Sequence, residues 1–153
     1  MSMPNITLRH GTDADMPAIL DLWVAAWTAT MPEVDFASRR DWLTERQRSM
    51  VSEGAIVLLA FQSEAMAGYA LVNPHTSYLD QIAVAPESQG SGIALKMLNA
   101  ARTLSPAKLS LHVNQSNTRA IRFYEREGFV KSGDGVNPRS GLPIYFYSWI
   151  ASS

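Results

Sequence analysis

Hydrophobic residues recur along this chain with two periods, one typical of helices and one typical of strands. Ile19, Trp23 and Trp27 fall on one face of a helix that begins near Thr12 and is ended by Pro32. Runs of β-branched and aromatic residues, bounded by Gly, Pro, Asn and Ser, predict strands. Further helices are expected over residues 38–53, 91–104 and 117–127, and strands over residues 6–9, 55–61, 65–72, 78–84, 108–113, 129–133 and 144–150.

The order of these elements is β-α-α-β-β-β-α-β-α-β-β, which predicts an α/β protein with helices packed on a sheet. The 153 residues suffice for one hydrophobic core but not for two. The chain has no internal repeat, low-complexity segment or linker, so residues 1–153 are expected to form a single domain.

The most informative segment is residues 82–94, where a strand passes through a glycine-rich turn into a helix. The apolar run ends at Pro86, and Gln89, Gly90 and Gly92 then precede a helical pattern. The first turn of a helix offers unpaired N–H groups and partial positive charge, and glycine lets the backbone approach a phosphate closely. A phosphate-bearing ligand is therefore expected, with an ordinary glycine-rich turn as the alternative. Neither the Walker motif nor the dinucleotide motif with its following acidic residue is present.

Two motifs in this order resemble the signatures of the GCN5-related N-acetyltransferase (GNAT) family. The pattern Gln-x-x-Gly-x-Ala, at residues 89–94, resembles the family's loop for the pyrophosphate of acetyl-CoA. The second signature, N-x-x-A-x-x-[FL]-Y-E-x-x-G-F, is matched at every fixed position, and the resemblance is strong over residues 78–130. The matched positions are Asn117, Ala120, Phe123, Tyr124, Glu125, Gly128 and Phe129.

The resemblance implies the acyl-CoA N-acyltransferase (GNAT) fold, a mixed sheet whose fourth and fifth strands splay apart. Acetyl-CoA, the acyl donor, is expected in the splay, with its pantetheine arm paired to the backbone around Ile82 and Val84. A backbone N–H near Val84 is expected to hold the thioester oxygen. Asn117 is expected to contact the cofactor as well as to cap its helix. The pyrophosphate is expected on Gln89, Gly90, Ser91, Gly92, Ile93 and Ala94.

Three residues are candidates for catalysis. The resemblance implies that Tyr124 donates a proton to the departing CoA thiolate, which suits a phenol whose pKa lies near that of an alkyl thiol. A Tyr that only packs against the sheet is the alternative. The base that deprotonates the amine is His112, Asp80 or a water chain. In the ribosomal-protein N-terminal acetyltransferases, which this segment resembles, a Glu at the position of His112 acts as the base.

The acceptor pocket is expected at the break between the first two helices, where the resemblance puts it. Trp27 and Phe36 are candidates for its lining, with core packing as the alternative, whereas Trp23 and Trp42 are assigned to the core. Arg139, in the loop before the last strand, is a candidate to bind a carboxylate or phosphonate of the acceptor, or is simply solvated.

The composition excludes several classes of binding partner, but it says little about which small substrate the protein uses. The formal net charge of −1 lacks the basic excess of a nucleic-acid binder, and no apolar run is long enough for a membrane helix. The absence of Cys excludes disulfides and a thiol nucleophile, and His10, His75 and His112 are too isolated to predict a metal site. We therefore expect a cytoplasmic protein, monomer or homodimer, without a metal, nucleic-acid or membrane partner.

These observations predict an enzyme that transfers an acetyl group from acetyl-CoA to a primary amine of a small molecule. Direct attack in a ternary complex is expected, because no cysteine is present to carry the acetyl group. Two alternatives stay open at this point. One is an enzyme that acetylates a protein N-terminus or lysine, and the other is a non-catalytic module that binds acyl-CoA.

Overall fold

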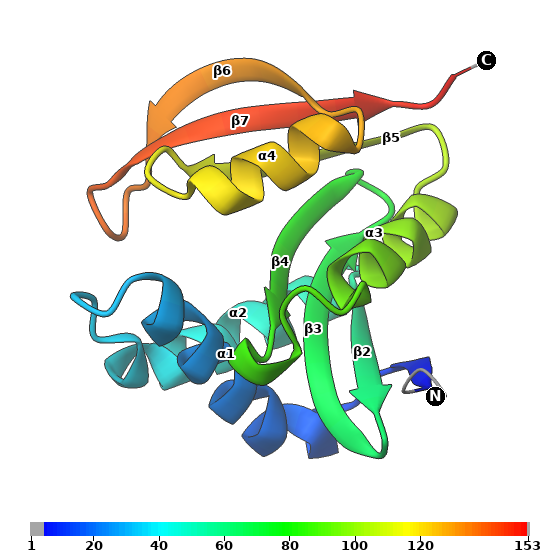
Figure 1. Ribbon diagram of the computed structural model, residues 1–153, viewed down its shortest axis with the longest axis vertical. Helices are drawn as coiled ribbons and strands as arrows, with labels where there is room; N and C mark the ends of the chain where they lie inside the picture. The colour runs from blue at the N-terminus through cyan, green and yellow to red at the C-terminus, as the bar shows by residue number, and fades with distance from the viewer. Residues whose placement is uncertain (1–4, 153) are drawn as a thin grey trace.

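The computed structural model describes residues 5–152, and its elements follow the expected order (Figure 1). The strands are β1 (Ile6–His10), β2 (Ile56–Gln62), β3 (Ala65–Asn73), β4 (Tyr78–Val84), β5 (Lys108–Asn114), β6 (Val130–Val136) and β7 (Pro143–Ile150). The α-helices are α1 (Met16–Thr30), α2 (Arg40–Ser52), α3 (Ile93–Leu104) and α4 (Thr118–Arg126). Short 3-10 helices, η1 (Asp13–Asp15), η2 (Phe36–Arg39) and η3 (Pro86–Ser88), precede α1, α2 and the loop before α3.

One sheet contains all seven strands, in the order β1-β2-β3-β4-β5-β7-β6. Neighbouring strands are antiparallel except β4 and β5, which run parallel and pair only at Tyr78 and Ser110. Beyond this pair the two strands diverge toward their carboxyl ends, as Figure 1 shows. The expected mixed sheet with splayed fourth and fifth strands is therefore confirmed.

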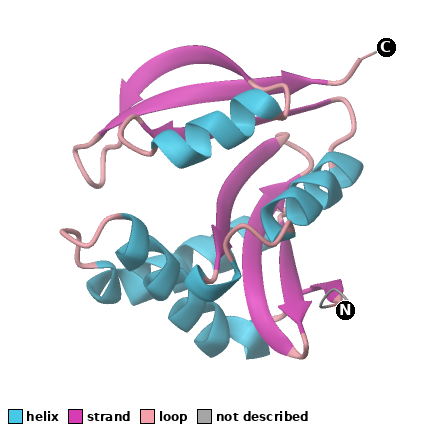
Figure 2. Ribbon diagram, viewed as in Figure 1, coloured by secondary structure: helices cyan, strands magenta, loops and turns pink. Residues whose placement is uncertain are grey.

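Side chains of the central strands alternate between two hydrophobic cores, one on each face of the sheet. On β3, Tyr69 and Leu71 belong to the core under α1 and α2, while Ala70 and Val72 belong to the core under α3 and α4. Figure 2 shows helices on both sides of the sheet. Because both faces are covered, β2 and β3 are apolar along most of their length rather than alternating with polar residues.

Element boundaries differ from the expected ones where local geometry decides them. The start of the first helix at Thr12 and Asp15 is confirmed as a capping box, in which the Thr12 N–H donates to the Asp15 carboxylate over 2.8 Å. Helix α3 begins at Ile93 rather than at residue 91, because Gly92 caps it with a left-handed φ of 89°. β6 continues to Val136, since its pairing with β7 persists through a register shift.

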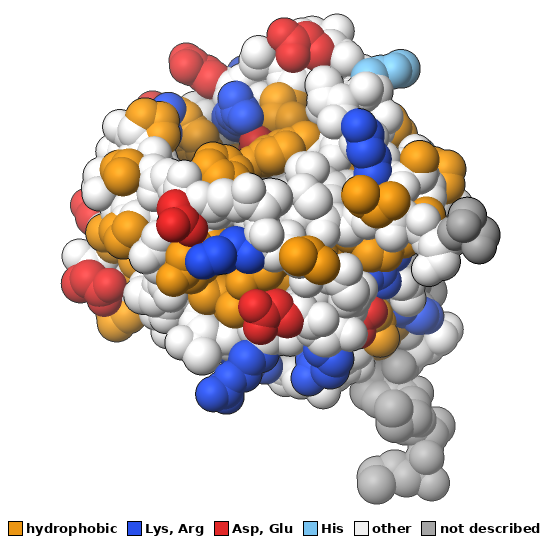
Figure 3. All heavy atoms as spheres, turned by 90° about the horizontal axis from the view of Figure 1, so that it is seen from above, with side chains coloured by type: hydrophobic (Ala, Val, Ile, Leu, Met, Phe, Trp, Pro, Cys, Tyr) orange, Lys and Arg blue, Asp and Glu red, His pale blue; other side chains and the backbone are white. Residues whose placement is uncertain are grey.

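No helix in the described part of the chain is long and apolar enough to cross a membrane. The face shown in Figure 3 carries acidic and basic side chains interspersed with hydrophobic ones, without a continuous patch of either charge.

Gly68 of β3 sets how closely α3 packs on the sheet. A Cβ at this position would lie 2.7 Å from Met97 Cε and 2.8 Å from Ile93 Cγ2, well inside van der Waals contact. The Met97 side chain is flexible, but the branched Ile93 side chain is stiff, so α3 has to shift. We expect Gly68→Ala to destabilise the fold by about 1–3 kcal/mol and to lower the melting temperature by several degrees in thermal denaturation. Gly133→Ala is the matched control, because its Cβ would lie at an ordinary 3.7 Å from Phe146. Equal melting temperatures of the two variants would contradict the prediction.

Candidate active site

The separation of β4 and β5 opens a cleft of about 780 Å³. One wall consists of residues 79–82 of β4, residues 111–114 of β5 and α4 with its cap, and the facing wall comes from α1, η2 and α2. Most of the segment 136–142, between β6 and β7, covers the end nearest α2. Eight residues predicted for the site from the sequence line this cleft: Trp27, Phe36, Asp80, Ile82, His112, Asn117, Tyr124 and Arg139.

The predicted phosphate loop, residues 89–94, follows η3, runs into the first turn of α3 and lies outside the cleft lining. Gly90 and Gly92 have φ of 82° and 89°, in the left-handed region that glycine adopts readily. A Cβ on either glycine would meet no atom within 4 Å, so the backbone here faces open space. The first helical hydrogen bond of α3 runs from the Lys96 N–H to the Gly92 carbonyl. The N–H groups of residues 93–95 therefore have no acceptor within the helix. This geometry suits an anion.

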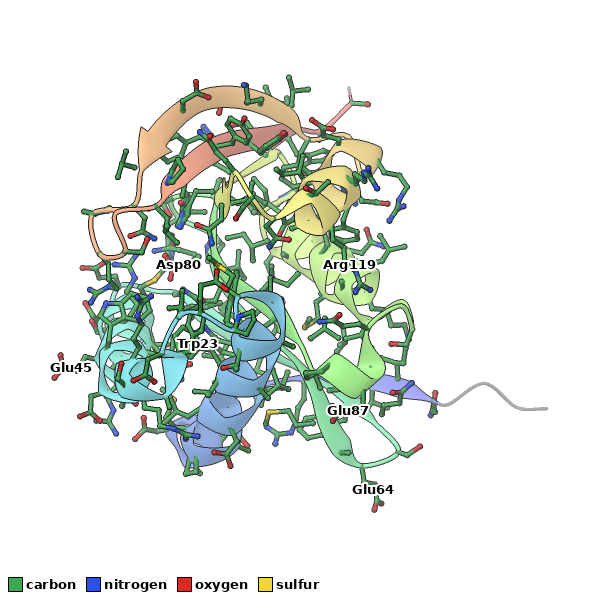
Figure 4. The ribbon with its side chains drawn as sticks, turned by 60° about the vertical axis from the view of Figure 1, so that its left-hand side comes forward. Trp23, Glu45, Glu64, Asp80, Glu87 and Arg119 are labelled. Atoms are coloured by element: carbon green, nitrogen blue, oxygen red, sulfur yellow. The ribbon has the colours of Figure 1, made fainter. Side chains whose placement is uncertain are left out.

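Arg119 adds a cation beside this loop. It lies in the first turn of α4, and its guanidinium donates a hydrogen bond to Gln89 Oε1 over 2.6 Å. In Figure 4 it lies between α4 and the loop before α3. The second family signature leaves this position open, so its place two residues after Asn117 was the only sequence signal for it.

Tyr124 is held in α4 with its ring against Phe123 and Phe129, at centroid distances of 5.3 and 5.5 Å. Although only 5% of the residue is exposed, it lines the cleft. Burial raises the pKa of Tyr124 well above its ordinary value, because a phenolate here would lose its hydration. The phenol therefore keeps its proton throughout the ordinary pH range.

Asn117 joins the cleft to the start of the same helix. Its side-chain Oδ1 accepts a hydrogen bond from the Ala120 N–H over 3.2 Å and so caps α4. The cap does not use the amide nitrogen, and the residue lines the cleft. Capping and contact with a ligand are therefore compatible.

His112 of β5 lies beside the rings of Tyr78 and Phe146. Its Nδ1 is 2.6 Å from the Tyr78 hydroxyl, in a hydrogen bond whose direction depends on the imidazole tautomer. Burial lowers the pKa of His112, and the nearby Asp80 and Arg46 act on it in opposite senses. Burial also raises the pKa of Tyr78 to about 12. Near neutral pH, therefore, the phenol is protonated and the imidazole is neutral.

Asp80 and Arg46 form a two-point ion pair that ties β4 to α2. Arg46 Nη2 lies 2.6 Å from Asp80 Oδ1, and Arg46 Nε lies 3.3 Å from Oδ2. Gln81 Nε2 also donates to Asp80 Oδ2 over 3.2 Å, while Gln81 Oε1 accepts a hydrogen bond from Trp23 Nε1 over 3.0 Å. Only 4% of the Asp80 side chain is exposed, whereas 45% of Arg46 is. Figure 4 shows Asp80 between the α1–α2 helices and the β5–β7 part of the sheet.

Four aromatic rings line the wall formed by α1, η2 and α2. Phe36 packs edge-on against Trp23 and face-on against Trp27, at centroid distances of 5.6 and 5.9 Å. Trp42 packs against Trp23 at 6.2 Å, but it is only partly buried, and the Arg139 guanidinium lies 4.2 Å from its ring centre. Trp42 thus belongs to the cleft wall as well as to the core, which the sequence alone did not show.

Comparison with known proteins shows which family has this fold. The sequence profile of the acetyltransferase (GNAT) family matches residues 16–129. The chain belongs to this family. The peptidyl-lysine N-acetyltransferase YjaB of Salmonella typhimurium is 25% identical over 138 residues, which cover 90% of this chain and 92% of the relative. The spermidine N(1)-acetyltransferase of Vibrio cholerae is 41% identical over 64 residues, which cover 39% of this chain and 37% of the relative.

Among solved structures, the PaiA N-acetyltransferase of Thermoplasma acidophilum, in complex with coenzyme A, has the same fold. Its TM-score with this GNAT protein is 0.79 at 15% identity, over 95% of this chain and 99% of that one. The predictions of a GNAT fold and of an acetyltransferase are therefore confirmed.

The sequence predicted His112 and Asp80 as site residues, but it did not predict the side chains that contact them, Tyr78 and Arg46. Tyr78 precedes Asp80 by two positions on β4, so the two-residue strand period was a signal that both share a face. Arg46 gave no such signal, because α2 meets β4 only in the folded chain. Val84, by contrast, lies outside the cleft lining. Within residues 5–152, no group of His, Asp and Glu is arranged to hold a metal ion.

A double-mutant cycle tests whether the Arg46–Asp80 pair braces the site. We expect a coupling energy of about 1–3 kcal/mol between Arg46→Gln and Asp80→Asn in chemical denaturation, since Arg46→Gln leaves the buried Asp80 carboxylate without its charged partner. The control is the ion pair of Arg48 with Asp13. Its arginine also lies on α2 and also forms two hydrogen bonds to the carboxylate, but 61% of the Arg48 side chain and 66% of the Asp13 side chain are exposed. Its coupling should stay below about 1 kcal/mol. Similar coupling in the two pairs would show that Asp80 gains nothing from its burial.

Proposed function

We propose that this GNAT protein transfers the acetyl group of acetyl-CoA to a primary amine of a small molecule, by direct attack in a ternary complex. The observation that carries the proposal is one cleft in which Tyr124, His112 and Asn117 face an aromatic wall. The end lined by Asn117 adjoins Arg119 and the 89–94 loop, while the other end meets α2 and the segment 136–142. Donor and acceptor would therefore enter from opposite ends and meet between β4 and β5.

Acetyl-CoA as the donor is supported by membership of the family and by the bound coenzyme A of the PaiA structure. The pyrophosphate belongs on the backbone N–H groups of the 89–94 loop, with Arg119 beside it. The pantetheine arm belongs along β4 at Ile82, which lines the cleft, and then toward Val84. An N–H of this strand would hold the thioester oxygen.

The proposed reaction needs one acid and one base. The amine nitrogen attacks the thioester carbonyl carbon, the C–S bond breaks, and the amine gives up a proton to the base. Tyr124 gives its proton to the departing CoA thiolate. Burial makes this phenol a weaker acid than in water, but a thiolate in the same apolar surroundings is also a stronger base, so the transfer stays nearly balanced.

His112 is the preferred base. Its lowered pKa keeps the imidazole neutral and able to accept a proton near pH 7. Acceptance at Nε2 requires the tautomer in which Nδ1 carries the hydrogen and donates it to the Tyr78 oxygen. Asp80 is less suited, because Arg46 occupies both carboxylate oxygens and protonation would break that ion pair.

A protein acceptor is the second candidate, since the relative YjaB is a peptidyl-lysine N-acetyltransferase and aligns with 90% of this chain. The form of the cleft favours the small amine, because the segment 136–142 and the η2–α2 wall line the same end of it. Acetyl transfer to a panel of small amines and to lysine-containing peptides, followed by mass spectrometry, tests the two. Modification of peptides alone would overturn the small-molecule proposal, and binding of coenzyme A without any transfer would indicate a non-catalytic module.

Tyr124→Phe tests the acid, since it removes one oxygen and keeps the ring packing. A positioned acid is worth about 10²–10⁴ in rate, so we expect at least a tenfold loss of turnover under single-turnover conditions. Affinity for coenzyme A and melting temperature should hardly change, because the hydroxyl is not needed for either. Phe123→Leu is the control for ring packing. Parental single-turnover rates in Tyr124→Phe would assign the proton to water instead.

The pH dependence of kcat/KM tests the base. A protonated imidazole accepts no proton, so activity should fall as the pH drops through the pKa of His112. Because burial lowers this pKa, the acid limb should lie below pH 6.5 rather than above it. His112→Gln should remove that limb and lower turnover. An unchanged profile in this variant would eliminate His112 and leave Asp80 or water as the base.

A further inference from the structure

The end of the cleft beneath the segment 136–142 carries more positive than negative charge. Arg39, Arg46 and Arg139 line the cleft, and Asp80 is the one carboxylate among its lining residues in the described chain. The Asp80 carboxylate is already paired with Arg46. Within residues 5–152, neither Arg39 nor Arg139 takes part in an ion pair. Two guanidinium charges at this end are therefore left without a balancing acid.

Both of these guanidinium groups rest on aromatic rings of the wall. Arg139 lies 4.2 Å from the centre of the Trp42 ring, and Arg39 lies 5.3 Å from the centre of the Phe36 ring. A guanidinium that stacks on a ring keeps the N–H donors at its edge available. The Arg139 backbone is held as well, since its N–H donates to Asn137 Oδ1 over 2.9 Å. The wall thus offers apolar surface and free N–H donors side by side.

We infer that the acceptor amine also carries a carboxylate and an apolar body, as in an amino acid with a large apolar side chain. This inference rests on the proposed function and specifies its substrate. The carboxylate would accept hydrogen bonds from Arg39 and Arg139, whose donor edges match its two oxygens. The apolar body would lie on Trp27 and Phe36. The amine would remain free to attack the thioester, so the bonds formed and broken are those of the proposed reaction.

The same charges disfavour the acceptors of the two relatives. A polyamine such as spermidine carries several positive charges, which the two unbalanced guanidinium groups repel. A lysine inside a peptide has no free carboxylate near its side-chain amine. The charge of the cleft therefore disfavours the acceptors for which both relatives are named.

Matched pairs of amines that differ only in the carboxylate test the inference. The probes are phenylalanine with 2-phenylethylamine, leucine with 3-methylbutylamine, and spermidine. We expect at least tenfold higher kcat/KM and tighter calorimetric binding, with coenzyme A present, for the carboxylate-bearing member of each pair. The phosphonate analogue of phenylalanine shows whether the site selects a carboxylate or any anion of that size.

Variants of the arginines show whether they cause the preference. In Arg139→Gln and Arg39→Gln the preference ratio should fall toward one, through KM more than through kcat, because these side chains bind the acceptor and do not react. Arg48→Gln is the control, since Arg48 lies on the same helix as Arg46 but outside the cleft lining. Its ratio should equal that of the parent.

The outcomes separate this inference from the proposed function. Three results overturn the inference: equal use of both members of each pair, a preference for spermidine, or binding of neither member. None of them overturns acetylation of another small amine or of a protein acceptor. A parental ratio in both arginine variants overturns the inference as well. Binding of coenzyme A without acetyl transfer to any amine overturns the proposed function itself.

Discussion

The parallel pairing of β4 and β5 ends after one residue pair, and the rest of the site depends on that interruption. Past Tyr78 and Ser110 the two strands diverge, so the backbone groups between them face a cleft rather than each other. Backbone N–H and C=O groups in a sheet interior need partners, which a ligand or water has to supply. The helices and the segment 136–142 are arranged around this opening and give it walls of different chemistry on its two sides.

Burial shifts the pKa values of the proposed acid, Tyr124, and the proposed base, His112, by the same physical effect. Loss of hydration disfavours whichever form of a group is charged. It therefore raises the pKa of Tyr124 and keeps the phenol protonated, and it lowers the pKa of His112 and keeps the imidazole unprotonated. Loss of hydration thus holds each of these two groups in the form that its proposed role needs.

Features with a local cause could be read from the sequence, and features made by tertiary contact could not. The glycine turn before α3 and the capped start of α4 are encoded within a few residues, so their motifs predicted these elements together with Asn117 and Tyr124 of the cleft. The ion pair of Arg46 with Asp80 joins residues 34 positions apart, and nothing in either segment signals the other. The same holds for Arg139 on Trp42, which is why that ring was assigned to the core. The mixed sheet and its splay followed from the family resemblance, since periodicity alone predicts strands but not their neighbours.

Where β4 and β5 separate, each strand has an unpaired edge, and both edges face the cleft rather than the outer surface. An edge strand exposed to solvent invites pairing with other chains, which proteins normally prevent with charge, proline or a covering segment. Here the aromatic wall and the segment 136–142 do the covering, so the unpaired edges are screened from bulky strands. A ligand that completes the ladder has to be slender and extended and has to carry its own amide groups. Under the proposed function, the backbone of these two edges selects an extended donor, while the side chains of the aromatic wall and the segment 136–142 select the acceptor.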